Sequence, residues 1–175
     1  MTWTDQIGNL LKQYTSGGAA AAPAPDVHAH FDQVAQAAPA SALAEGLSAA
    51  FKSDQTPAFG QMLSTLFNNS TGEQKAGIMN QIMSSVPSGT LTSLLSGAGL
   101  AGSLGHGATQ ITPEQAQNIS PEAVQQLATQ AHSANPSLVD SVSAFYAQHS
   151  TLVKTLGGTA LTIALAKVAE RQRQA

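Results

Sequence analysis

The stretch TPAFGQMLSTLFNNSTGEQKAGIMNQIM, residues 56–83, carries the pattern that decides the fold. Its large apolar side chains recur three or four residues apart, at Phe59, Met62, Leu63, Leu66 and Phe67 and again at Ile78, Met79, Ile82 and Met83. A helix has 3.6 residues per turn, so this spacing places each set on one helix face. Between the two sets, Ser70 and Glu73 fit a capping box, which predicts that the second helix starts there.

The same spacing recurs on both sides of this stretch. Thr112, Ser120 and Asn135 each precede a proline, and a capping residue before proline predicts a helix start. The last helix is predicted from about residue 151 to residue 171. No stretch of four or more residues alternates with period two. The sequence therefore predicts an all-α fold, a bundle of seven to nine short helices in two packed lobes with no β-sheet.

Glycine and proline divide the helical pattern into segments. Residues 1–14 are predicted to form a tethered amphipathic helix, and residues 15–25, TSGGAAAAPAP, a linker. Residues 26–96 are predicted to form an N-terminal helical lobe. The glycine-rich residues 97–110 are predicted to join it to a C-terminal helical lobe of residues 111–175.

The composition excludes several classes of protein. Seven basic and ten acidic residues give a net charge of −3, which argues against a nucleic-acid binder, because such proteins need a dense basic stripe. The chain has no cysteine, so disulfides and cysteine-ligated metals are excluded. We find neither a secretory signal nor an apolar run of about 20 residues, the length that spans a bilayer. A cytoplasmic location is the resulting expectation.

Asp26, His28, His30 and Asp32 form the densest cluster of metal-ligating residue types in the chain. On a helix, Asp26 with His30 and His28 with Asp32 are pairs four residues apart, a spacing that can present two ligands to one metal. The two histidines are two residues apart and point to different sides. One hypothesis is therefore a metal-dependent hydrolase. The alternative is a solvent-facing first turn whose acidic groups complement the helix N-terminus.

Residues 97–102, GAGLAG, match the G-x-G-x-x-G pattern of dinucleotide-binding loops. That pattern works only where a strand leads into the loop, and here a leucine-rich helical segment precedes it. We interpret it as a hinge and expect no cofactor. A G-x-S-x-G nucleophile motif is also missing from the sequence. These observations favour a non-enzymatic protein.

Two sets of apolar side chains are candidates for binding a partner or ligand. The first lies on the tethered N-terminal helix and comprises Trp3, Ile7, Leu10, Leu11 and Tyr14. The second can line an adaptable hydrophobic groove and comprises Phe59, Met62, Met79 and Met83. Core packing is the alternative for the second set, because a chain of this size must bury most of its large apolar residues.

The segment from ITPEQ at residues 111–115 through QQL at residues 125–127 resembles the YidB-like family of small bacterial helical proteins. Proteins of that family also combine glycine-rich stretches with short helices that open on Ser/Thr-Pro-Glu and are rich in glutamine and leucine. The resemblance implies a bacterial protein with a homeodomain-like helical fold and no established activity. It carries no functional residue over to this chain.

The sequence thus predicts a non-enzymatic interaction or assembly protein. A protein partner or a second copy of the chain is the expected partner, because a low-charge surface tolerates self-association. Contact with a membrane surface is a further candidate, and the sparse basic residues weaken it. One alternative function is binding of a small apolar ligand or lipid between helices. The other is the metal-dependent hydrolase built on the cluster at residues 26–32.

Overall fold

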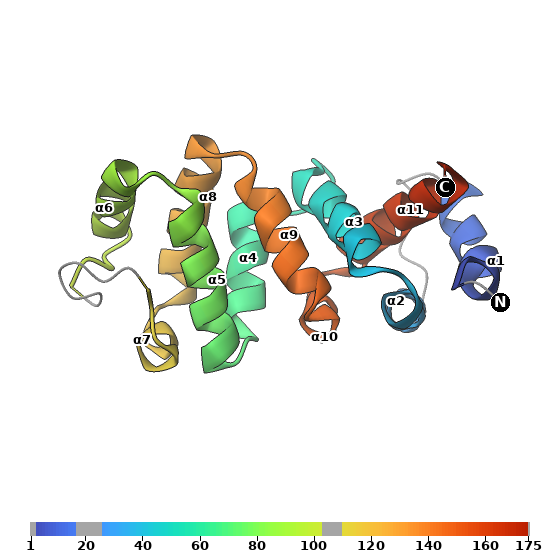
Figure 1. Ribbon diagram of the computed structural model, residues 1–175, viewed down its shortest axis with the longest axis horizontal. Coiled ribbons are helices and arrows are strands. Elements are labelled where there is room, and N and C mark those ends of the chain that lie inside the picture. Colours follow the sequence, from blue (N-terminus) through green and yellow to red (C-terminus); the bar gives the residue numbers. More distant parts are fainter. Residues whose placement is uncertain (1–2, 17–25, 103–109, 175) are drawn as a thin grey trace. The chain divides into compact units, whose positions relative to one another are not determined.

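The computed structural model describes residues 3–16, 26–102 and 110–174. These residues form eleven α-helices and no β-strand, which confirms the predicted all-α fold with more helices than expected (Figure 1). The helices are α1 (Trp3–Ser16), α2 (Val27–Ala37), α3 (Ala40–Lys52), α4 (Phe59–Asn68), α5 (Gly72–Ser85), α6 (Ser88–Gly97), α7 (Pro113–Gln117), α8 (Pro121–Ala134), α9 (Leu138–Ala147), α10 (Ser150–Val153) and α11 (Gly158–Gln174). Within the described ranges, none of these helices has the length and hydropathy needed to cross a membrane.

Capping side chains set several helix starts close to their predicted positions. Thr112 accepts a hydrogen bond from the Gln115 N–H, and the Gln115 side chain accepts one from the Thr112 N–H, which makes a capping box at α7. The box at α5 lies one residue beyond the predicted pair, because Thr71 and Gln74 form it. Ser70 instead donates its hydroxyl to the carbonyl of Leu66 at the end of α4.

The glycine-rich segment begins as the ordered end of α6. Gly99 has a positive φ of 72°, its N–H donates to the Ser96 carbonyl, and the Leu100 N–H donates to the Leu95 carbonyl. These two bonds and the left-handed glycine define a Schellman motif, which satisfies the last carbonyls of a helix. Residues 97–102 therefore end and follow a helix and are not preceded by a strand. Residues 103–109 of the predicted joint and most of the predicted linker lie outside the described residues.

The chain divides into two compact units whose boundaries differ from those of the predicted lobes. Unit 1 comprises Met1–Pro57 and Ser143–Ala175, and unit 2 comprises Ala58–Val142. The glycine-rich segment lies inside unit 2. The reason is the position of α11, which packs against α1, α2 and α3 and so brings both ends of the chain into unit 1 (Figure 1). The predicted last helix is divided into α10 and α11 at residues 154–157.

Unit 1 is organised by the close crossing of α3 and α11. At this crossing a Cβ placed on Gly46 would lie 2.6 Å from the carbonyl oxygen of Ala164. Only a hydrogen fits there, so the two backbones are in direct contact. Arg171 of α11 makes an ion pair with Glu45 of α3 beside the same crossing.

Unit 2 contains an equivalent crossing of α4 and α8. A Cβ on Gly60 would lie 2.6 Å from the carbonyl oxygen of Gln125. A second contact fixes the segment before α7 on α5: the Ile111 N–H donates to Oδ1 of Asn80 at 2.7 Å, and Nδ2 of Asn80 donates to the Ile111 carbonyl at 3.2 Å. These two hydrogen bonds attach Ile111, which follows the glycine-rich segment in the sequence, to α5.

We expect Gly46→Ala and Gly60→Ala each to lower the free energy of unfolding by about 1–2 kcal/mol. The added methyl group meets a backbone carbonyl oxygen, so its cost lies in the upper part of the usual range of about 1–3 kcal/mol. The better helix propensity of alanine returns up to about 1 kcal/mol. Gly89→Ala in α6 is the matched control, because a Cβ there has no neighbour within 4 Å. Urea unfolding followed by circular dichroism measures all three. Equal stability of the Gly46→Ala and Gly89→Ala variants would contradict the close crossing.

Candidate helix-docking site

Helix α1 packs its apolar face against other helices of unit 1. Leu11 is 1% exposed and Tyr14 6% exposed, and Ile7 is also buried. These residues are four and three positions apart, so they form one stripe along the helix. The stripe faces α2 and α11, against which α1 packs. Leu10 lies half-buried beside the stripe, whereas the Trp3 side chain is outside the described part of α1.

We call the surface that receives α1 the docking face. It consists of His30 on α2 and of Ala169, Gln172 and Arg173 on α11. Between α11 and α1 a hollow of about 180 Å³ remains, lined on the α1 side by Gly8, Leu11 and Lys12. Ligand pockets usually measure about 300–1,000 Å³. The hollow is therefore smaller than the pocket that the small-ligand alternative requires.

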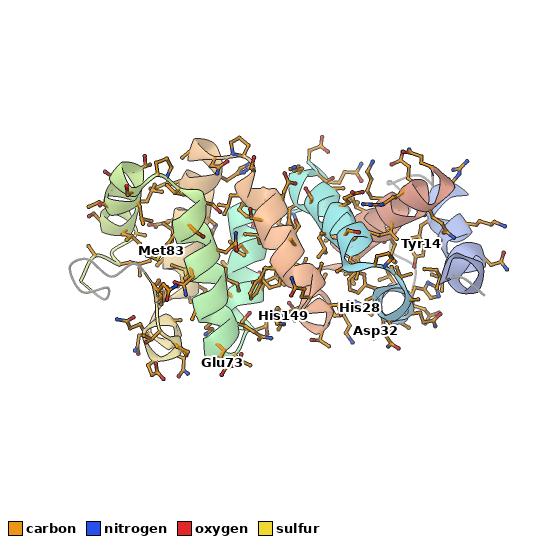
Figure 2. All side chains as sticks on the ribbon, viewed as in Figure 1. Tyr14, His28, Asp32, Glu73, Met83 and His149 are labelled. Atoms are coloured by element: carbon orange, nitrogen blue, oxygen red, sulfur yellow. The ribbon has the colours of Figure 1, made fainter. Side chains whose placement is uncertain are left out.

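A hydrogen bond lies at the C-terminal end of the stripe, at Tyr14. Oη of Tyr14 and Nδ1 of His30 are 2.7 Å apart and share a hydrogen bond. The two rings meet edge to face, with centroids 5.9 Å apart. Figure 2 labels Tyr14, the α1 member of this pair. The apolar contacts of Ile7 and Leu11 have no such directionality, so this bond helps to orient α1 on the docking face.

The environment of Tyr14 disfavours its ionised form. Burial raises the pKa of the Tyr14 hydroxyl above its ordinary value, and the nearby charge of Asp26 raises the pKa further. Both effects penalise a phenolate, because a buried negative charge loses its hydration and is repelled by the carboxylate. The docked state of α1 therefore favours a protonated tyrosine.

The opposite side of α2 makes an ion pair. Nζ of Lys154, directly after α10, lies 2.8 Å from Oδ2 of Asp32. His30 and Asp32 are two residues apart, which is a rotation of about 200° on a helix, so they serve neighbours on opposite sides. The Lys154 and Asp32 side chains are 33% and 38% exposed. An ion pair this open to solvent contributes about 0–1 kcal/mol, so it orients α2 more than it stabilises it.

The predicted metal cluster is not brought together. Across the described ranges, no group of three or more histidine, aspartate or glutamate side chains is placed to hold a metal ion. His30 is bonded to Tyr14, Asp32 is paired with Lys154, and His28 is exposed. Figure 2 labels His28 and Asp32, both on α2. Asp26 occupies the N-cap of α2 without a side-chain capping bond. The hydrolase alternative thus has no assembled set of ligands behind it.

The predicted methionine and phenylalanine groove lies in the core of unit 2. Phe59 and Met62 on α4 and Met79 and Met83 on α5 are all buried. Their placement matches the core-packing alternative. The sequence reasoning missed two contacts, Tyr14 with His30 and Asp32 with Lys154. These pairs are 16 and 122 residues apart, and no local pattern signals a pairing over such separations.

Comparison with protein-family models, with curated proteins and with solved structures finds no match to this chain. The resemblance to the YidB-like family therefore stays a prediction. The site is defined by its own geometry, as a surface of α2 and α11 on which an amphipathic helix is seated.

We expect alkaline pH to release α1. The pKa of Tyr14 is raised in the folded state, so its contribution to stability is complete below the ordinary tyrosine pKa of about 10. Above that pH the unfolded state loses its proton first, and the contribution is lost as the pH rises through the folded pKa. Trp3 is the only tryptophan in the chain and lies on α1. Time-resolved anisotropy of its fluorescence measures release as a gain of local motion.

Tyr14→Phe is the control for this titration. The variant has no ionisable group at this position, so its anisotropy should change at a higher pH than that of the native protein. Identical alkaline transitions in both proteins would show that Tyr14 does not govern the docking of α1.

Proposed function

We propose that this chain is a non-enzymatic interaction and assembly protein that binds an amphipathic helix on the docking face. The observation that carries the proposal is the seating of α1 there through Ile7, Leu11 and Tyr14. Protein surfaces that recognise helices commonly take apolar anchors spaced i, i+4 and i+7, which is the spacing of these three residues. The predicted cytoplasmic location belongs to the same proposal.

The sequence between α1 and α2 supports a docking role for α1. Residues 17–25 are glycine, alanine and proline only, so this segment has no charged or large apolar side chain with which to bind. The affinity of α1 for the docking face then resides in α1 itself. A short linker keeps a tethered group at an effective concentration on the order of millimolar. A competing helix gains access most easily when the link is cut.

The scaffold beneath the docking face is held from several directions. Helix α11 crosses α3 in backbone contact at Gly46 and is tied to it by the Arg171–Glu45 ion pair. Helix α2 contacts α11 and α10, and its Asp32 is paired with Lys154. A surface built on packed helices keeps its shape when a bound helix leaves, which is the property that a helix-binding site needs.

The experiment uses the full chain with a protease recognition sequence inserted within residues 17–25. After cleavage, native mass spectrometry should find the α1 fragment still bound to the rest of the chain. Cleaved protein, titrated into a trace amount of a fluorescein-labelled peptide of residues 1–16, should bind that peptide in place of the fragment, with a saturable rise in fluorescence anisotropy. Loss of the fragment together with no peptide binding would overturn the proposal.

Two peptides of equal charge test whether the apolar stripe makes the contact. The Leu11→Asp peptide should bind at least about 100-fold more weakly, because it places a carboxylate at a buried position, which costs several kcal/mol. The Asn9→Asp peptide is the matched control, since Asn9 is exposed on the other side of α1. Its affinity should stay within about twofold of the native peptide. Equal weakening of both peptides would show that charge rather than burial controls binding.

A further inference from the structure

We infer that the Tyr14–His30 contact selects the bound helix, so that the docking face prefers helices with two aliphatic residues four positions apart and a tyrosine three positions further. This inference rests on the proposed function and specifies the partner. In α1 the pattern is Ile7, Leu11 and Tyr14. The partner so defined is an amphipathic helix with a hydroxyl-bearing aromatic residue at the third anchor.

The apolar anchors alone cannot set the register of a docked helix. Hydrophobic burial is non-directional and depends on the area removed from water. Ile7 and Leu11 therefore favour many helices of suitable spacing, and a helix displaced by one turn would bury similar groups. A hydrogen bond has a narrow range of distances and angles. The 2.7 Å contact between Oη of Tyr14 and Nδ1 of His30 fixes one register among these alternatives.

The surroundings of the pair give the hydrogen bond its weight. Tyr14 is only 6% exposed, so a docked helix removes most of this residue from water and leaves its hydroxyl in a part-buried hydrogen bond. A buried hydroxyl without a partner costs about 1–3 kcal/mol. The two rings also pack edge to face, and a short polar side chain in place of the tyrosine cannot make this ring contact. A helix that places its tyrosine elsewhere would bury the hydroxyl without a partner.

His30 is presented from a helix whose Val27, Phe31 and Val34 side chains are buried, and the contact on the other side of α2 adds a directional restraint. Rotation of α2 about its axis would carry His30 away from α1, and the pairing of Asp32 with Lys154 opposes that rotation. His30 is thus presented from an oriented helix. His30 and Asp32 are two residues apart and point to opposite sides of α2. Asp32 can therefore pair with Lys154 while His30 stays available to the tyrosine of the bound helix.

The test is a double-mutant cycle on the cleaved protein, with the fluorescein-labelled peptide of residues 1–16 as the probe. Two peptides, native and Tyr14→Phe, are titrated against protein carrying His30 and against the His30→Leu variant. We expect the native peptide to bind the His30 protein about five- to tenfold more tightly than the Tyr14→Phe peptide does. With His30→Leu this preference should disappear or reverse, because the tyrosine hydroxyl then has no partner.

The conservative variant His30→Asn supplies the rescue. Its amide can exchange a hydrogen bond with the tyrosine hydroxyl from a position close to that of Nδ1, so most of the preference for the native peptide should return. The Tyr14→Phe peptide serves as the folding control, since it makes no bond to residue 30. Its affinity reports the loss of the edge-to-face ring contact, which should change it by less than about tenfold among the three proteins. That change is subtracted from the change seen with the native peptide, as a double-mutant cycle requires.

The outcomes separate this inference from the proposed function. If both peptides bind the His30 protein equally well, or if the preference survives His30→Leu, the selection role of the pair is wrong and helix docking stands. If neither peptide binds the cleaved protein, helix docking itself fails. If His30→Leu does not fold, the ratio of the two affinities for the His30 protein and for His30→Asn decides.

Discussion

The arrangement of unit 1 depends on the backbone contact between α3 and α11. Gly46 brings the two helices so close that no side-chain carbon fits between its Cα and the Ala164 carbonyl. Close approach increases the number of dispersion contacts along the crossing, and these are individually small but large in sum. It also places the C-terminal helix α11 against the N-terminal helices α1, α2 and α3. The surface that receives α1 exists only because α11 is held there.

The polar contacts of unit 1 have a different role from its core. The Tyr14–His30 bond and the Asp32–Lys154 ion pair lie on opposite sides of α2. Neither contributes much free energy compared with the burial of Leu11 and its neighbours. Both are directional, so they determine how α1 and α2 are oriented once hydrophobic burial has brought the helices together. The proposed binding role would use such contacts for selectivity.

The helices and many of their ends could be predicted from the sequence, because both depend on residues within a turn of one another. Thr112 and Ser120 cap the helices that follow them, as their position before proline indicates. The division into units could not be predicted in this way. The glycines at residues 97–102 predict a joint between two lobes, yet the first of them end α6 in a Schellman motif inside unit 2. Glycine content alone does not distinguish a helix end from a boundary between units.

The sequence by itself determined the all-α class, the apolar stripe of α1 and the residue types available for a site. The tertiary structure alone decided which helices pair, and therefore what His30 and Asp32 do. Their cluster with Asp26 and His28 resembles a set of metal ligands when only neighbours along the chain are considered. In the fold, His30 is bonded to Tyr14 and Asp32 is paired with Lys154, and both partners come from other segments of the chain. Helical periodicity is a local property, whereas the partner of a side chain depends on contacts between segments that the chain brings together only when it folds.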